Sequence, residues 1–239
     1  MSKSLPETAY SQKQAAEYDQ HRFISSSGKA VHIAERKCLF DCLSYIEDGC
    51  KILEVGCGTG RLMIEVARKG FRVDGADGSQ PMLDEAAEKF RDTAAFRTTF
   101  YLCEAANLPV VDKSYSFVYS IRLLNQTESP AYALKVISEI IRVTEPNGYC
   151  LIEFMNVWRP RIGKNKRAST RLKPSEVLEI SLESGAELVK WEGAFFLGMQ
   201  AYQKVPKILL YPLTKIDRFL SSIFPRICSR TYILVRRVS

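Results

Sequence analysis

Short apolar runs alternate with amphipathic segments between residues 51 and 155 of the chain. Each run is brief and bounded by glycine or polar residues, so it predicts a buried strand rather than a helix. The five predicted strands are Lys51–Val55, Phe71–Ala76, Thr98–Cys103, Ser116–Ile121 and Tyr149–Met155.

The segments between these strands carry apolar residues at helical spacing, together with helix start and stop signals. Gly70 ends the first segment, and Pro81 lies in the first turn of the second. The predicted helices are Arg61–Lys69, Pro81–Arg91 and Tyr132–Val143. Strands that alternate with helices at this spacing predict an α/β fold, in which a parallel sheet is covered on both faces.

The polar start of the chain predicts a segment that lies outside the sheet. We expect a short helix over Gln14–His21 and a loop over Ser25–Gly28. Apolar residues then recur at helical spacing over residues 30–46, which predicts an amphipathic helix. We therefore divide the chain into an N-terminal lid segment, residues 1–29, and a main domain, residues 30–239.

The last third of the chain predicts two further strands with a helical insertion between them. In the insertion, residues 199–228, apolar residues recur at helical spacing; we expect Pro212 to open the helix and Pro225 to close it. The other elements are a helix over Pro174–Ser184 and strands over Glu187–Glu192 and Thr231–Arg237.

Composition limits the class of protein. With 239 residues, 46% of them hydrophobic, the chain is large enough for one sizeable core. No stretch approaches the roughly 20 apolar residues of a membrane span, and the polar start does not resemble a secretory signal. The seven cysteines form no CxxC pair and no ligand-like spacing with the two histidines. We expect buried thiols in a reducing cytoplasm, and no metal site.

The net charge of +7 is unevenly distributed. Phe154–Ser175 contains seven basic residues and no acidic residue, and Met199–Arg230 contains six basic residues against Asp217 alone. A localised positive field favours an anionic partner, such as a phosphate-bearing substrate, an acidic membrane surface or a nucleic acid.

The first predicted strand runs into the glycine-rich stretch ILEVGCGTGR, residues 52–61. A strand, a glycine turn and a helix together form a site where a nucleotide-like ligand approaches bare backbone. A Walker loop would need Gly-Lys-Ser/Thr, but Arg61-Leu62 follows here. A dinucleotide fingerprint would need a third glycine where Arg61 stands. The pattern that fits is E-x-G-x-G-x-G.

Four motifs follow one another along the chain: LEVGCGTGR (53–61), VDGADGSQPML (73–83), CEAANLPVVDKSYSFV (103–118) and EIIRVTEPNGYCLIEF (139–154). In this order they resemble the motifs of the class I S-adenosylmethionine-dependent methyltransferases, specifically the broad group that includes the ubiquinone and menaquinone methyltransferases. The resemblance runs from about Tyr18 to Glu192. Ser116 and Asn147 depart from the family pattern, and Gln126 stands where many relatives carry histidine.

The resemblance implies a Rossmann-like, seven-stranded, mostly parallel sheet with helices on both faces and an antiparallel last strand. It also implies S-adenosyl-L-methionine as cofactor. The glycine loop would hold its methionine half, Asp77 its ribose, and Glu104 with Ala105 the adenine edge. The implied cofactor-binding residues are Tyr18, Arg22, Glu54, Gly56, Cys57, Gly58, Gly60, Asp77, Gly78, Met82, Glu104, Ala105, Ser120 and Ile121.

No catalytic residue is assigned, because methyl transfer needs mainly proximity and alignment, and a base only for a weakly acidic nucleophile. His21, in the lid, is a candidate base, with an ordinary surface histidine as the alternative. Residues that follow strand ends are expected to face the acceptor; these are Arg122, Asn125, Gln126 and Asn156.

Two elaborations bear on the acceptor. The basic loop WRPRIGKNKR, residues 158–167, follows the fifth strand and fits either a phosphorylated or carboxylated acceptor or an ordinary solvated loop. The insertion has an apolar stripe flanked by basic residues. It is either an interfacial helix on anionic lipid or a helix packed over the sheet or at a dimer contact.

These features predict a methyltransferase that acts on a small or lipid-linked, anionic metabolite, at oxygen. Its localisation would be cytoplasmic, with peripheral contact to an anionic membrane, and no obligate protein partner is evident. One alternative is a nucleic-acid methyltransferase, which SIRLLNQ, residues 120–126, disfavours because a DPPY- or NPPY-type motif is missing there. Another is a binding module that kept the fold without the chemistry.

Overall fold

The computed structural model describes residues 10–91, 97–159, 169–202 and 205–238. Its seven strands are Lys51–Val55 (β1), Arg72–Asp77 (β2), Phe100–Leu102 (β3), Tyr115–Ser120 (β4), Thr144–Met155 (β5), Ala186–Ala194 (β6) and Arg230–Arg237 (β7). Its α-helices are Gln12–Phe23 (α1), Ser26–Leu43 (α2), Met63–Ala67 (α3), Gln80–Arg91 (α4), Pro130–Val143 (α5), Pro174–Glu183 (α6) and Lys207–Ile223 (α7). Short 3₁₀ helices cover Leu124–Gln126 (η1), Met199–Tyr202 (η2) and Pro225–Ile227 (η3).

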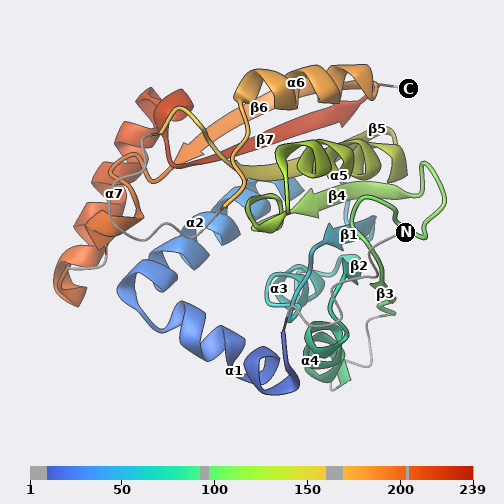
Figure 1. Ribbon diagram of the computed structural model, residues 1–239, viewed down its shortest axis with the longest axis horizontal. Helices are drawn as coiled ribbons and strands as arrows, with labels where there is room; N and C mark the ends of the chain where they lie inside the picture. Colours follow the sequence, from blue (N-terminus) through green and yellow to red (C-terminus); the bar gives the residue numbers. More distant parts are fainter. Residues whose placement is uncertain (1–9, 92–96, 160–168, 203–204, 239) are drawn as a thin grey trace.

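The strands form one sheet in the order β3-β2-β1-β4-β5-β7-β6 (Figure 1). Strands β1 to β5 run parallel, and β7 runs antiparallel between β5 and β6. The predicted fold class, with its antiparallel last strand, is confirmed. The helical insertion between the final two strands is α7 with its flanking 3₁₀ turns.

Helices cover both faces of the sheet. Successive residues of a strand point to opposite sides, and the strands carry apolar side chains on both, so both faces must be shielded from water. Leu53 and Val55 of β1 belong to the apolar cluster beneath α5 and α6. Ile52, which precedes Leu53, belongs to the cluster that includes buried residues of α2, α3 and α4. Because the strand is covered on both faces, its last four residues are all buried, and three of them are apolar.

The predicted loop at Ser25–Gly28 is wrong, because α2 begins at Ser26. The Ser25 hydroxyl accepts a hydrogen bond from the Gly28 amide at 3.1 Å and so caps the helix. Gly28 is buried, and a Cβ there would meet the Arg22 carbonyl oxygen at 2.2 Å. The glycine therefore serves a close approach of two helices, and the boundary placed after residue 29 falls inside α2.

Two other predicted boundaries differ from the structure. Helix α7 begins at Lys207, so Pro212 lies inside it rather than at its start. Packing of Leu210 and Leu213 against the rest of the fold holds the helix together across the proline. Strand β5 begins at Thr144 rather than at the predicted Tyr149, and its pairing with β4 is irregular over this added part, where Asn147 has a φ of 64°.

Candidate active site

A cleft of about 940 Å³ opens beyond the carboxyl ends of β1, β2 and β4. In an open α/β sheet, ligands bind at this edge, where loops from adjacent strands meet. Thirteen of the residues expected to bind cofactor or acceptor line it: Tyr18, Glu54, Gly56, Cys57, Gly58, Asp77, Gly78, Met82, Glu104, Ala105, Ile121, Arg122 and Gln126.

The glycine loop after β1 folds back onto the end of β2. The amides of Gly56 and Cys57 both donate to the Ala76 carbonyl, at 2.7 and 3.0 Å. Gly56 has a φ of 77°, and a Cβ there would lie 2.8 Å from the Leu123 side chain. Gly58 has a φ of 52°, with no atom near the position of a Cβ. The loop thus presents bare backbone to the cleft, as a close-fitting ligand requires.

Asp77, at the end of β2, ties the glycine loop to the start of α4. One carboxylate oxygen accepts from the Gly58 amide at 2.8 Å, and the other accepts from the Ser79 amide at 2.9 Å. Burial raises the pKa of Asp77, and these backbone hydrogen bonds oppose the shift. Each oxygen keeps a further lone pair, so the group can also accept from two ligand hydroxyls.

Glu54 is a buried carboxyl at the inner end of the cleft. Tyr119 donates to it at 2.9 Å. Burial raises the pKa of Glu54 to about 8, and the Tyr119 hydrogen bond opposes this only in part. At neutral pH the group is therefore largely protonated until a cation approaches it.

Glu104 lies across the cleft from the glycine loop. Its carboxylate accepts from the Tyr132 hydroxyl of α5 at 2.5 Å, and the pKa of Tyr132 is raised to about 12 by its burial and by Glu104. Ala105 and Met82 add apolar surface beside it. A cleft lined by both a carboxylate and apolar side chains suits a flat, nitrogen-bearing ring system.

The lid helix α1 is fastened to the glycine loop by a small polar cluster that the sequence analysis missed. Asp19 accepts from the Thr59 hydroxyl at 3.0 Å and from the Lys89 ammonium at 2.5 Å. Lys89 also donates to the Thr59 carbonyl at 2.7 Å. The lid, the loop and α4 therefore meet at one point at the edge of the cleft.

Arg61 fastens the same loop to the first two helices. Its guanidinium donates to the buried Glu35 of α2 at 2.6 Å, contacts His32 and lies over the Phe23 ring at 4.1 Å. Burial, followed by the charge of Arg61, lowers the pKa of His32. The residue that excluded a dinucleotide fingerprint thus holds the lid in place.

A buried charge network lies behind Arg122, at the carboxyl end of β4. Glu153 accepts from the Arg122 amide at 2.7 Å and from the Arg230 guanidinium at 2.6 Å. Arg122 has a φ of 70°, and its guanidinium lies 3.5 Å from the Tyr18 hydroxyl and 3.8 Å from Glu35. Burial lowers the pKa of Arg122, with Glu35 opposing. The network holds a cation at the wall of the cleft.

Six predicted residues lie outside this lining. Ser120 is buried and donates to the Val55 carbonyl at 2.9 Å, and Asn156 is buried and donates to the Arg226 carbonyl at 2.7 Å. His21 is 78% exposed and contacts Glu17, so the structure gives its role as a base no support. The others outside the lining are Arg22, Gly60 and Asn125.

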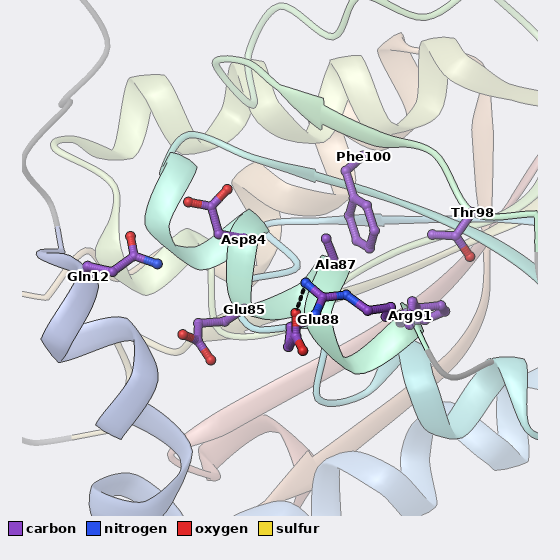
Figure 2. Close-up of a pocket in the computed structure, with 9 residues that line it drawn as sticks. Gln12, Asp84, Glu85, Ala87, Glu88, Arg91, Thr98 and Phe100 are labelled. Carbon is purple, nitrogen blue, oxygen red and sulfur yellow. Dashed lines mark ion pairs between the residues drawn. The ribbon is translucent and has the colours of Figure 1, made fainter. Parts of the chain in front are cut away.

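A second, more open hollow of about 770 Å³ lies between the start of α1 and the outer face of α4. Figure 2 shows the carboxylates of Asp84, Glu85 and Glu88 around it, with Glu88 paired to Arg91. It lies away from the strand ends and gathers like charges from a single solvated helix. It is therefore a weaker candidate for a binding site.

All seven cysteines are free thiols. Within the described ranges, no group of three or more His, Cys, Asp or Glu residues is placed to hold a metal ion. Residues 160–168, most of the basic loop, lie outside the described residues. Its basic residues Arg161, Lys164, Lys166 and Arg167 are among them.

Residues 52–148 match the family described as "Methyltransferase domain". A methyltransferase of Streptomyces halstedii is 32% identical over 43% of this chain and 37% of its own length. A ubiquinone biosynthesis O-methyltransferase of Rickettsia canadensis is 24% identical over 61% of this chain and 66% of its own. The chain thus spans well under half of the Streptomyces protein.

Solved structures share the whole fold. A phosphoethanolamine N-methyltransferase of Haemonchus contortus, in complex with S-adenosyl-L-methionine, superposes with a TM-score of 0.69, at 18% identity, over 98% of this chain and 59% of its own. The magnesium protoporphyrin IX methyltransferase of Synechocystis, with bound S-adenosylhomocysteine, gives 0.61 at 16% identity, over 88% and 86%.

Fold, cleft and matches define the class of protein. The chain has the class I S-adenosylmethionine-dependent methyltransferase fold, and the resemblance drawn from its motifs is confirmed. The match to the family of methyltransferase domains covers residues 52–148, which is less than half of the chain.

Proposed function

We propose that the protein binds S-adenosyl-L-methionine in this cleft and methylates an oxygen of a small or lipid-linked, anionic acceptor. The observation that carries the proposal is the pairing of Asp77 with the Gly58 and Ser79 amides. It presents a carboxylate beside bare backbone, at the sheet edge where this fold binds nucleotide-like ligands.

The residues present fit the cofactor. Asp77 would accept from the ribose hydroxyls, the glycine loop and Glu54 would hold the amino-acid end, and Glu104 and Met82 would hold the adenine. Once bound, S-adenosylmethionine supplies an electrophilic methyl group on a sulfonium. The chain's own contribution is to align the two reactants and exclude water, with α1 as the covering element.

Arg122 supports an anionic acceptor. Its guanidinium lines the cleft beside Tyr18 and is desolvated, with Glu35 at 3.8 Å as a distant counter-charge. An anionic acceptor would complete the neutralisation of this cation. Gln126 lines the cleft beside Arg122. Its amide NH₂ donates to the Arg122 carbonyl at 2.6 Å, and its amide oxygen accepts from the Tyr10 hydroxyl at 3.2 Å. Transfer to oxygen is supported by the O-methyltransferases among the relatives.

Labelled methyl transfer tests the proposal. The protein, S-adenosylmethionine with a tritiated methyl group, and panels of carboxylated phenols and lipid quinols should together yield labelled product. Water-soluble and solvent-extractable label separate the small from the lipid-linked acceptor. If S-adenosylhomocysteine binds but no panel member is labelled, the methyl-transfer proposal fails. A [4+2]-cyclase of this fold, with a TM-score of 0.62 at 19% identity, illustrates that fold alone does not establish the reaction.

Affinity for S-adenosylhomocysteine should depend on the ionisation of Glu54. Its pKa of about 8 means that an ammonium beside it must expel a proton on binding. We expect the Kd to fall by up to about tenfold for each pH unit between pH 6 and 7.5, and to level off above pH 8. Calorimetry in two buffers of different ionisation enthalpy measures the released proton.

Glu54→Gln is the control for this pH dependence. The variant should bind more weakly at pH 8, and its Kd should be nearly flat across the same range. A wild-type Kd that does not change with pH, with no proton released, would place the ligand's ammonium elsewhere.

A further inference from the structure

The outward side of α7 carries a surface that neither the fold nor the cleft explains. Figure 1 shows α7, in orange, at the end of the molecule toward which the arrow of β4 points, so it lies on the same side as the cleft. Within the described ranges, no helix is long and apolar enough to cross a bilayer. Most of the apolar side chains of α7 are exposed at the surface of the protein.

The inner side of α7 is firmly attached. Leu210 and Leu213 pack in a small core with Ala30 and Val31 of α2. Asp217 is 3% exposed and accepts from the Leu197 amide at 2.7 Å. The single acidic residue of the helix is thus buried and hydrogen-bonded within the fold, and it adds no negative charge to the outer surface.

The outer side is apolar along its whole length. Ile208, Ile216, Phe219 and Ile223 are between 51% and 85% exposed, and they recur at helical spacing. A helix of 17 residues is about 26 Å long, so these side chains form a continuous stripe. Phe224 and Ile227, 47% and 44% exposed, extend it past the helix end.

Cations flank this stripe. Lys215 and Arg218 are exposed on one edge, and Arg226 follows the helix. The Lys215 ammonium lies over the Tyr211 ring at 4.6 Å, at the border of the apolar stripe. An apolar stripe with basic flanks and no exposed acid matches the interfacial helices that lie on anionic lipid.

We propose that this face, residues 208–227, docks on an anionic membrane surface, with the apolar stripe among the acyl chains and the cations at the headgroups. Charge favours this occupant over a second copy of the chain. A two-fold contact would place the same patch against itself and bring Lys215, Arg218 and Arg226 of two copies together. Anionic headgroups supply the counter-charges that the patch lacks.

Vesicle flotation tests the proposal with the intact protein and no methyl acceptor, so its outcome is independent of methyl transfer. Vesicles of phosphatidylcholine with about a third phosphatidylglycerol should carry the protein upward, and binding should weaken in high salt. Vesicles of phosphatidylcholine alone should bind at least tenfold less. Equal flotation with both kinds of vesicle, or with neither, would overturn the proposal.

Two double variants separate the charge from the apolar stripe. Lys215→Glu with Arg218→Glu, and Ile216→Ser with Phe219→Ser, should each weaken flotation by at least about tenfold. All four side chains are exposed, so melting temperatures should stay near that of the wild type. The matched control, Arg72→Glu with Arg97→Glu, reverses two exposed charges on other parts of the surface and should float like the wild type.

Light scattering tests whether a second copy of the chain occupies this face instead of a membrane. If the protein is a dimer that Ile216→Ser with Phe219→Ser converts to a monomer, and neither form floats, the face is a subunit interface and the proposal is wrong. If the control loses flotation as much as the Lys215 and Arg218 variant, net charge alone governs binding, and the assignment to α7 is also wrong.

Discussion

Replacing Asp77 with alanine is expected to weaken the binding of S-adenosylhomocysteine by about 100-fold or more, because two hydrogen bonds to a charged group are lost. The change acts twice. It removes the acceptor for the ribose hydroxyls, and it frees the Gly58 and Ser79 amides that the carboxylate holds at 2.8 and 2.9 Å. Isothermal titration at pH 8, close to the pKa of about 8 of Glu54, measures the loss.

Asp77→Asn divides these two effects. The amide keeps one acceptor oxygen, but its NH₂ group replaces the other oxygen and faces a backbone N–H. We expect a Kd between those of the wild type and of Asp77→Ala. Asp84→Ala is the matched control, because Asp84 is an exposed carboxylate on α4 at the second hollow (Figure 2). Binding by Asp77→Ala that equals binding by Asp84→Ala would remove Asp77 from the site.

The sheet and the glycine loop were predictable because their signals are local. Lys51–Val55 is a short run rich in apolar residues that leads straight into glycines, and the structure has a strand with the same bounds. The spacing from Gly56 to Asp77 is set by one strand–turn–helix–strand unit, so sequence order brings both to one edge of the sheet. This local order explains why the loops after β1 and β2 line the same cleft, from Gly56 to Gly58 and from Asp77 to Ser79.

The network behind the cleft was not predictable, because its partners are distant in the sequence. Arg61 reaches Glu35 26 positions earlier, and Arg230 reaches Glu153 77 positions earlier. Each residue taken alone has the pattern of a solvated surface charge. Only tertiary packing shows that Glu35 and Glu153 are wholly buried. The burial of Asn156, which we expected to face the acceptor, was unpredictable for the same reason. Its side chain donates to the Arg226 carbonyl, 70 positions away in the sequence.

Replacing Glu153 with alanine is expected to destabilise the fold by about 3–5 kcal/mol, the range for breaking a buried ion pair. Glu153 has no exposed surface. Its two oxygens hold the Arg230 guanidinium and the Arg122 amide. Burial lowers the pKa of Arg230, but Glu153, acting together with Tyr232 and Glu35, outweighs burial, so the pKa of this guanidinium is raised. Alanine would leave the Arg230 guanidinium buried without the Glu153 carboxylate. Urea denaturation of the wild type and the variant, fitted with a common m-value, measures the loss in the free energy of unfolding.

Glu192→Ala on strand β6, which β7 separates from β5 in the sheet, is the matched control. Glu192 also pairs with a cation, Lys190 at 2.6 Å, but both side chains are 32% exposed. Water screens such a pair, so its loss should cost less than about 1 kcal/mol. A Glu153→Ala cost no larger than this would mean that water or a neighbouring group already neutralises Arg230.

Glu153→Gln combined with Arg230→Gln tests whether the cost comes from charge or from hydrogen bonding. The two amides retain a donor and an acceptor at these positions while removing both charges. Recovery of more than half of the Glu153→Ala loss would assign most of the cost to the uncompensated cation. Stability as low as that of Glu153→Ala would instead show that the uncompensated cation is not the source of the cost. It would point to the hydrogen-bond geometry that only the carboxylate provides around the Arg122 amide, where the backbone has a φ of 70°. In that case S-adenosylhomocysteine binding should fall in parallel, because Arg122 lines the cleft.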